Sequence, residues 1–271
     1  ENDKIFHNSL YDMGWLRRMG VHVGGKIHDT MFAAPLVDEN QYGYSLNKLG
    51  QRYVGEVKDE TLLEEAAKAY KINPKSEMYK LPAKYVGKYA EQDAALTLKL
   101  WGILKEGLKS ENVEKIYELE TSLIPILLEM RWKGVPVDMD RAEVVSKKLM
   151  SEERSILQRI HKEYGVTPDL WAAKSVAIVF DRAGLSYPRT PKTNAPSFSG
   201  DWLESHDHKL ANDIARARKL NKARTTFIDK MVLEHNVKGR IHGELHPLRS
   251  DRGGTVTGRF SSSNPNLQQV P

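Results

Sequence analysis

Apolar residues recur at helical spacing along most of the chain, with a period near 3.6 residues. The longest patterns predict helices over residues 82–108, 113–133, about 140–164 and about 208–234. Shorter patterns predict helices over residues 9–19, 31–37, 61–70 and 174–184, a helical segment after Ser45 and a helix that Ser199 caps. Extended segments are predicted at residues 26–30 and 240–245. The pattern thus predicts many helices and few, short strands.

The first predicted helix carries a carboxylate on its apolar side. Asp12 shares a face with Trp15, Leu16 and Met19, at spacings of three, four and seven residues. Burying a carboxylate without a partner is costly. Asp12 therefore either turns to solvent at the start of its helix or binds a cation. Asn8 lies one turn earlier and is a candidate cap.

A second aspartate lies in the middle of the apolar stripe of the helix over residues 82–108. Asp93 follows Tyr89 by one turn, so the phenol and the carboxylate project from the same side. Two interpretations fit this arrangement. Asp93 is either a buried aspartate hydrogen-bonded to the tyrosine, or a metal ligand beside a tyrosine that orients a water. Asp29 or Thr30 is the expected cap of the helix over residues 31–37.

Three polar segments have ordinary interpretations from composition alone. Residues 253–271 have almost no apolar periodicity and suit a surface loop, although their glycines, hydroxyls and Arg259 also suit phosphate and sugar oxygens. Residues 187–199 are rich in proline, which is typical of a linker. The basic side chains of the helix over residues 208–234 lie away from its apolar stripe, which is typical of a solvated face.

Length and composition narrow the class of protein. A chain of 271 residues with 40% hydrophobic residues can hold one large or two ordinary domains with packed cores. No apolar stretch approaches the length of a bilayer-spanning helix, so a soluble protein without a membrane partner is expected. The chain has no cysteine, which excludes disulfides and thiolate-bound metals. Residues 201–271 hold 12 basic and 8 acidic residues, a bias that suits a phosphate backbone bound there.

The order of residues in the last segment is more informative than its composition. Family A DNA polymerases, the polymerase I type, have a signature that this segment resembles, with mild departures at Phe260, Gln269 and Val270. In that family the signature joins the thumb to the palm and lies along the primer-template duplex. The resemblance implies DNA contacts for Thr257, Arg259, Ser261, Ser262, Asn266 and Gln268.

Two motifs near the N-terminus resemble the second and third motifs of the proofreading 3′→5′ exonuclease domain of the same polymerases. They are Asn8-x-x-x-Asp12 and Tyr89-x-x-x-Asp93, with Asp29-Thr30-Met31 between them. The resemblance implies that Asp12, Tyr89 and Asp93 are catalytic, that Asp12 and Asp93 bind two Mg²⁺ or Mn²⁺ ions, and that Asn8 contacts DNA. Such hydrolysis needs hard carboxylate oxygens. The Asp-x-Glu pair that completes the family's site is missing, so this chain alone is expected to be inactive.

Two further stretches resemble the DNA-binding thumb of the family. The proline-rich connector resembles a thumb loop that meets DNA phosphates, which implies contacts by Lys192, Ser197 and Ser199. Residues 218–227 resemble a run that holds the duplex, and the matching positions are Arg218, Lys222 and Thr226.

The resemblance implies a domain plan and a function. An α/β, RNase H-like exonuclease domain without its early strands is expected over residues 1–110, a mainly α-helical thumb over 111–250, and the start of the palm over 251–271. The expected protein is a piece of a DNA-directed DNA polymerase, with a phage-type source as one candidate. Its expected partners are primer-template DNA, a single-stranded 3′ end and, in the longer protein, dNTPs.

The same resemblance implies a monomer in the cytoplasm of a bacterium or a phage-infected host. The competing interpretation is a DNA-binding module whose exonuclease fold is only a scaffold. An unrelated helical protein with coincidental motifs is disfavoured, because five separate matches occur in family order.

Overall fold

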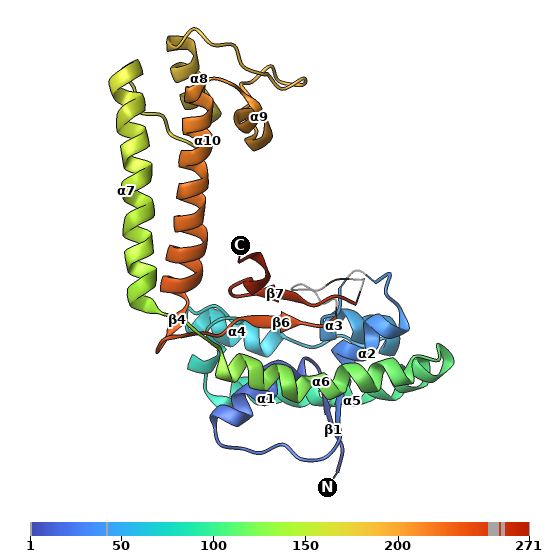
Figure 1. Ribbon diagram of the computed structural model, residues 1–271. Helices are drawn as coiled ribbons and strands as arrows, with labels where there is room; N and C mark the ends of the chain where they lie inside the picture. The colour runs from blue at the N-terminus through green and yellow to red at the C-terminus, as the bar shows by residue number, and fades with distance from the viewer. Residues whose placement is uncertain (1, 42, 249–254, 256–257, 271) are drawn as a thin grey trace. The chain divides into compact units, whose positions relative to one another are not determined.

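The computed structural model describes residues 2–41, 43–248, 255 and 258–270 (Figure 1). These residues separate into two compact units. The first unit lies within Glu1–Gly134 and Gly243–Gln269, and the second lies mainly within Val135–His242. Each unit is built around its own hydrophobic core.

The first unit begins with a strand, a helix and a second strand. β1 (Lys4–Phe6) and β2 (Ile27–Asp29) pair in parallel, with Phe6 opposite Asp29, and α1 (Ser9–Arg18) connects them. The other elements before residue 135 are α2 (Thr30–Val37), α3 (Leu46–Leu49), the π-helical η1 (Gly50–Val54), α4 (Thr61–Ala69), the 3-10 turn η2 (Met78–Lys80), α5 (Ala83–Ser110) and α6 (Glu114–Lys133). The unit also includes β6 (Glu244–His246), β7 (Ser261–Ser263) and η4 (Leu267–Gln269), with β6 and β7 antiparallel.

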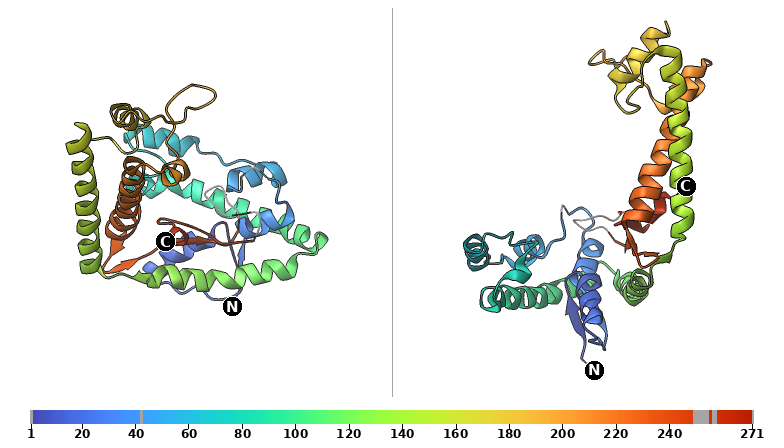
Figure 2. Two further views of the ribbon diagram at one scale, coloured as in Figure 1. Left: turned by 45° about the horizontal axis from the view of Figure 1, so that its top comes forward. Right: turned by 90° about the vertical axis from the view of Figure 1, so that its left-hand side faces the viewer.

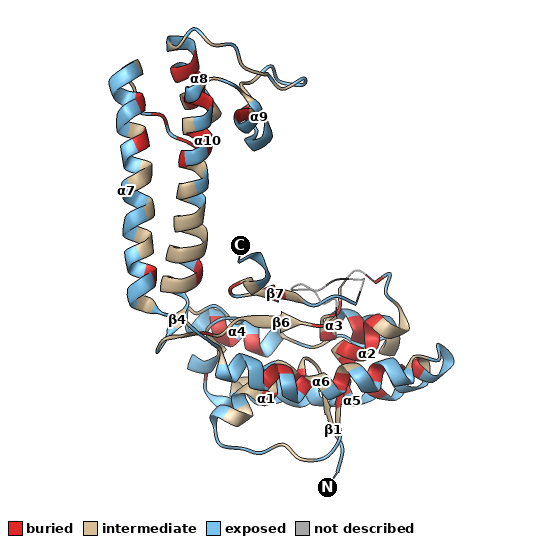
Figure 3. Ribbon diagram, viewed as in Figure 1, coloured by how far each residue is buried: buried red, intermediate tan, exposed pale blue. Residues whose placement is uncertain are grey.

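Buried residues of α1, α2, α5 and α6 form the core of the first unit. Figure 3 marks the buried residues in red. Leu49, Leu100, Leu104 and Ile124 are fully buried there. Because Ile124 belongs to this core, α6 is part of the first unit, whereas the predicted domain boundary assigned residues 111–133 to the thumb. The compact units need not coincide with the domains of the family, so the predicted boundaries of the exonuclease domain, the thumb and the palm stay a prediction.

The predicted apolar face of α1 is wrong. Trp15 and Met19 are 57% and 67% exposed, so Asp12 does not lie on a buried stripe with them. The buried residues of α1 are Ser9 and Met13, and this side packs toward α6. Asp12 lies next to the buried side and is half-buried. The spacing alone did not identify the buried face of α1, because a helix this short has apolar residues on more than one side.

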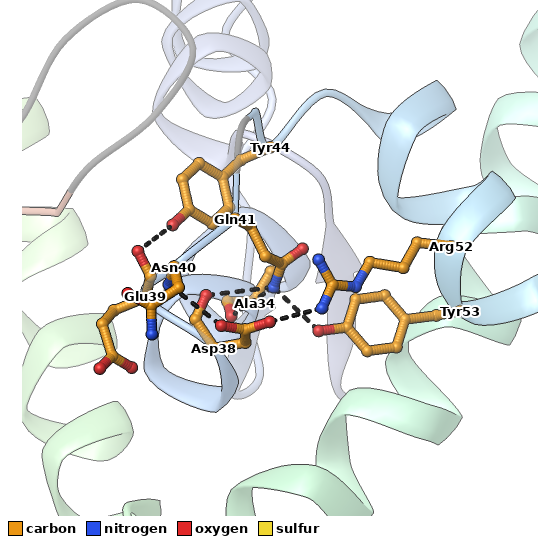
Figure 4. A network of polar contacts seen from close by, with 8 residues as sticks. All are labelled: Ala34, Asp38, Glu39, Asn40, Gln41, Tyr44, Arg52 and Tyr53. Carbon is orange, nitrogen blue, oxygen red and sulfur yellow. Dashed lines mark hydrogen bonds and ion pairs between the residues drawn. The ribbon is translucent and has the colours of Figure 1, made fainter.

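A polar network joins the end of α2 to η1 (Figure 4). The side-chain amide of Gln41 donates to the backbone oxygen of Asp38 at 3.1 Å and to the hydroxyl of Tyr53 at 2.8 Å. The Arg52 guanidinium donates to the Asp38 carboxylate at 2.5 Å. The network therefore holds η1 in place at the point where the chain turns toward α4.

The second unit is mainly helical. Its helices are α7 (Met139–Tyr164), α8 (Ala173–Arg182), α9 (Gly200–Ser205), α10 (Lys209–Lys222) and the π-helical η3 (Ala223–Glu234). α7 runs antiparallel to α10 and η3, and the views in Figures 1 and 2 show α7 beside α10. Arg159 on α7 and Asp213 on α10 form an ion pair at 2.6 Å across this packing. The predicted helix over residues 208–234 is helical throughout, but its second half is π-helical.

The predicted strand over residues 240–245 is divided between two sheets. β5 (Arg240–Ile241) lies between β3 (Val135–Pro136) and β4 (Asn236–Val237) in an antiparallel sheet, whereas β6 pairs with β7. The break falls next to Gly243, where a Cβ atom would lie 2.9 Å from the Leu267 side chain. A side chain larger than glycine at this position would therefore force the Leu267 side chain to shift.

In coarse terms the predicted fold class is confirmed, because the described residues form a mostly helical structure with small sheets. The assignment to an RNase H-like fold stays a prediction. Among the helices of the described segments, none has the length and apolar character needed to cross a membrane.

Candidate active site

A cavity of about 750 Å³ lies within the first unit. Its lining includes Asn8 and Asp12 from the start of α1, Tyr89 and Asp93 from α5, and Lys58 from the loop between η1 and α4. Arg131 of α6 and Glu244 of β6 also line it, and they form an ion pair at 2.5 Å. The structure thus places four of the predicted exonuclease residues around one cavity, although they come from two different helices.

Burial and two neighbouring carboxylates raise the pKa of Asp12. Its pKa is raised to about 6 by burial first, and then by the negative charges of Asp29 and Asp93. Both effects disfavour the ionised form. Such a group is stabilised as a carboxylate when a cation binds beside it, so the raised pKa indicates a place suited to positive charge.

The Asp93 carboxylate has a cationic partner that the sequence did not indicate. The ammonium of Lys58 lies 2.9 Å from Oδ1 and 3.1 Å from Oδ2 of Asp93, and it donates to the hydroxyl of Tyr89 at 3.0 Å. The same ammonium lies 4.7 Å from the centre of the Tyr89 ring. Burial opposes protonation of Lys58, but the hydrogen bonds to Tyr89 and Asp93 outweigh burial and raise its pKa.

The start of α1 is held by Asp29 rather than by the predicted cap. Asn8 occupies the N-cap position with φ 74°, in the left-handed region, and its side chain makes no capping hydrogen bond. Asp29 instead accepts the backbone amides of Asn8 at 3.0 Å and Ser9 at 2.6 Å. It also accepts the amide of Met31 at 2.8 Å, so Asp29 is the one of the two predicted candidates, Asp29 and Thr30, that caps α2.

Two residues of the cavity have side chains of the kind that binds a divalent cation. Asp12 and Asp93 offer the hard oxygen atoms that Mg²⁺ and Mn²⁺ prefer. Asp29 is already used by three backbone amides and is not a further ligand. Among the described residues, no group of three or more histidine and acidic side chains is arranged to hold a metal. An ion held by these two carboxylates would take its other ligands from water or phosphate oxygens.

The described residues of the C-terminal signature are joined by hydrogen bonds within the segment. Ser262 is buried, and its hydroxyl donates to the backbone oxygen of Pro265 and accepts the amide of Leu267, both at 3.3 Å. The Gln268 side chain donates to the Phe260 carbonyl at 3.0 Å. Three other predicted DNA contacts lie in this segment. The Asn266 side chain accepts the Gln268 amide, Ser261 lies in β7, and Arg259 is exposed. The predicted contact Thr257 lies outside the described residues.

The predicted DNA-binding residues of the second unit differ in their surroundings. Arg218 is half-buried and donates to the carbonyl oxygens of Leu170 at 2.7 Å and Phe198 at 2.6 Å. Burial lowers the pKa of Arg218. The guanidinium thus has a structural role, and its contact with DNA stays a prediction.

The remaining residues of this group are more accessible. Lys222 and Lys192 are exposed, and Lys192 lies in a hairpin closed by a backbone bridge between Arg189 and Pro196. Ser199 caps α9 by accepting the amide of Trp202 at 3.3 Å, as predicted. Ser197 and Thr226 are half-buried.

Sequence reasoning missed Lys58. The residue stands in a charged loop without periodicity, and no spacing relates it to Tyr89 or Asp93. The sequence also did not indicate that Asp29 accepts backbone amides at the start of α1 as well as at the start of α2. The only available signal was the position of Asp29 at the end of a short strand.

Comparison with known proteins gives matches along the whole chain. The family model described as 3′-5′ exonuclease matches residues 1–109, and that of DNA polymerase family A matches residues 139–271. The DNA-directed DNA polymerase of Pseudomonas phage M6 is 34% identical over 281 residues, which cover 99% of this chain and 42% of that protein. DNA polymerase DpoZ of Vibrio phage phiVC8 is 32% identical over 298 residues, which cover 98% of this chain and 46% of that protein.

A solved structure shares the fold. The POL domain of Pol1 from M. smegmatis, in complex with DNA primer-template and dNTP, matches with a TM-score of 0.77 and 23% sequence identity, over 99% of this chain and 43% of that chain. The present chain therefore spans less than half the length of these relatives. The matched parts of these families are a 3′-5′ exonuclease region and the start of a polymerase domain. The chain belongs to DNA polymerase family A.

Proposed function

We propose that this chain contributes a 3′→5′ exonuclease site and part of a duplex-binding surface to a longer DNA polymerase. The observation that carries the proposal is the meeting of Asp12, Tyr89 and Asp93 around one cavity. Asp12 comes from α1, whereas Tyr89 and Asp93 lie one turn apart on α5, so the cavity joins residues of two helices. They are the residue types that metal-assisted phosphodiester hydrolysis uses.

In this proposal Asp12 and Asp93 hold Mg²⁺ or Mn²⁺ together with ligands from outside this chain's described residues. Two such ions, when bound about 3.5 to 4 Å apart, supply an activated water and stabilise the leaving oxygen. The hydroxyl of Tyr89 orients that water against the terminal phosphodiester. Asn8 lines the same cavity, and in this proposal its side-chain amide contacts the single-stranded 3′ end.

In this proposal the DNA duplex is bound by basic and polar groups of the second unit and of the C-terminal signature. Lys222 and Lys192 contact phosphates, with hydroxyl groups of Ser197, Ser199 and Thr226 beside them. Phosphate contacts of this kind position a protein on DNA without reading its sequence. Arg259, Ser261, Asn266 and Gln268 follow the primer-template near the primer end, and Ser262 supports the loop. Templated synthesis from dNTPs belongs to the longer protein.

One observation favours a different function, that of a DNA-binding module with an inactive exonuclease scaffold. The Lys58 ammonium already neutralises Asp93, as an internal ion pair would in a site that no longer holds metal. Such a module would bind DNA and hydrolyse nothing.

The deciding experiment uses the longer polymerase with Asp93→Ala. We expect loss of 3′→5′ hydrolysis of a single-stranded oligonucleotide, with primer extension retained. Glu106→Ala is the matched control, because Glu106 lies exposed on the same helix and pairs with Lys109. An unchanged hydrolysis rate in Asp93→Ala would contradict the assignment, and a parent without any hydrolysis would favour the inactive scaffold.

A further inference from the structure

Lys58 is anchored by its backbone against two helices. Its amide donates to Oδ1 of Asn47 in α3 at 3.0 Å. The next residue, Asp59, donates its amide to the side chain of Gln92 in α5 at 3.1 Å. The backbone on both sides of the Lys58 side chain is therefore held in place, and the side chain reaches the cavity from a defined point.

The ammonium of Lys58 is largely shielded from solvent, since the side chain is 11% exposed. A buried ammonium is costly unless it is paired and hydrogen-bonded. Here it donates hydrogen bonds to Oδ2 of Asp93 at 3.1 Å and to the Tyr89 hydroxyl at 3.0 Å, and it lies at ion-pair distance, 2.9 Å, from Oδ1 of Asp93. One cation thus contacts both α5 residues that the proposed hydrolysis uses.

The direction of these hydrogen bonds matters for Tyr89. An ammonium has donors and no acceptor, so the Tyr89 oxygen must accept from Lys58. The phenol proton is then left to donate to another group. Without Lys58, the phenol would be free to rotate or to accept from water, and the donor direction would be undefined.

We propose that Lys58 is a positioning residue of the exonuclease site, which holds the Tyr89 hydroxyl as a donor toward the cavity and shares the Asp93 carboxylate with the bound cation. This inference rests on the proposed function of the site. Lys58 does not touch the reacting atoms in this scheme, and it acts through Tyr89 and Asp93.

A purely structural role would be to fasten the loop between η1 and α4 to α5. Two other contacts already do this outside the cavity. The Asp59 amide is bound to Gln92, and the Lys99 ammonium of α5 lies 2.6 Å from the Glu56 carboxylate. Both partners of the Lys99 pair are about half exposed. Lys99 is therefore a matched control, because it joins the same loop to the same helix without entering the cavity.

The proposal predicts opposite effects on metal binding and on hydrolysis. In Lys58→Met the positive charge next to Asp93 is removed while the length of the side chain is kept. Mn²⁺ should bind several-fold more tightly, because no ammonium competes for the carboxylate. Single-turnover hydrolysis should nevertheless slow by about 10- to 100-fold, the range that is typical when a group supporting the ligands of a metal is removed.

The test uses the longer polymerase, with Mn²⁺ binding followed by titration of the protein alone and hydrolysis followed with a single-stranded oligonucleotide. Lys99→Met should leave both measurements unchanged. A double variant of Lys58→Met with Tyr89→Phe should be no slower than the slower single variant within about twofold, because both changes remove one function. Retained primer extension shows that the variants fold.

Weaker or unchanged Mn²⁺ binding in Lys58→Met would overturn the proposal, as would additive losses in the double variant. If the parent hydrolyses nothing, the proposed function fails. The Mn²⁺ titration still decides whether Lys58 and a cation share Asp93, because it needs no turnover.

Discussion

The Asp29 carboxylate accepts the backbone amide of Ser9 at 2.6 Å, across 20 positions of the sequence. It also caps α2 through the amide of Met31. The hydroxyl of Tyr117 on α6 accepts the Asp29 amide at 2.9 Å. A single, fully buried residue at the end of β2 thus holds the start of α1, which carries Asp12 into the cavity.

Asp29→Ala should destabilise the first unit strongly. The change leaves three amides without their acceptor, one of them buried and two part-buried, and hydrogen bonds to charged groups contribute roughly 1.5–3 kcal/mol each. We expect a loss of at least about 3 kcal/mol in the free energy of unfolding, measured by urea denaturation. Asp59→Ala is the control, because the Asp59 side chain accepts only the amide of Thr61 at the exposed start of α4, and its loss should cost about 1 kcal/mol or less. Equal losses in the two variants would contradict the dual role of Asp29.

The Asp12 carboxyl of the metal-free protein should contribute stability that is lost as pH rises from about 4 to about 6. The pKa of Asp12 is raised to about 6 in the folded state, from an ordinary value of 3.8. Between these values the folded chain keeps a proton that the unfolded chain has released, so rising pH favours unfolding. Asp12→Asn should remove this part of the pH dependence and stabilise the protein above pH 6. Urea unfolding midpoints at several pH values with a chelator provide the measurement, and an identical slope in Asp12→Asn would refute it.

Arg218→Ala should destabilise the second unit. The guanidinium holds the carbonyls of Leu170 and Phe198, which lie in segments on either side of α8. Loss of two charge-assisted hydrogen bonds should lower the free energy of unfolding by about 2 kcal/mol or more. Arg216→Ala is the control, because Arg216 is exposed and its pair with Glu152 lies at the surface. Thermal unfolding distinguishes the two, and a similar shift for both would argue against a structural Arg218.

Lys222→Ala should weaken DNA binding without affecting stability. Lys222 is exposed, and a lost phosphate contact should reduce the slope of log affinity against log salt by roughly one. The loss should be similar for every duplex sequence. Lys192→Ala should behave in the same way. Binding of the longer polymerase to primer-template DNA at several salt concentrations measures the slope, and an unchanged slope would indicate a merely solvated face.

Arg259→Ala should separate matched from mismatched primer ends. Purine N3 and pyrimidine O2 lie at nearly the same places in the minor groove for every correct pair, so one guanidinium can detect pairing without reading sequence. We expect extension of matched primers to slow by about 10- to 100-fold, as for one lost charge-assisted hydrogen bond, and of mismatched primers much less.

Arg259→Lys should rescue only partly, since an ammonium lacks the planar fork. Pre-steady-state extension by the longer polymerase supplies the rates. Equal slowing on both kinds of primer would show that Arg259 is only a phosphate anchor or a structural residue.

The sequence by itself determined the local structure of this protein. The helices begin and end within a few residues of their predicted bounds, and Asp29 and Ser199 cap α2 and α9 as predicted. Tyr89 and Asp93 were correctly placed on one side of a helix, because residues four apart are neighbours in any α-helix. These features depend on periodicity and capping, which act over a few residues.

Only the tertiary structure decided which distant groups meet. Lys58 contacts both Tyr89 and Asp93, and Asp29 accepts amides at the start of α1 as well as of α2. Arg218 donates to two backbone carbonyls, and α6 packs in the core of the first unit. The tertiary structure also showed that Trp15 and Met19 face solvent, so the apolar side of α1 was chosen wrongly from the sequence. These outcomes depend on packing between segments far apart in the chain, and a short amphipathic pattern does not specify which neighbour will cover it.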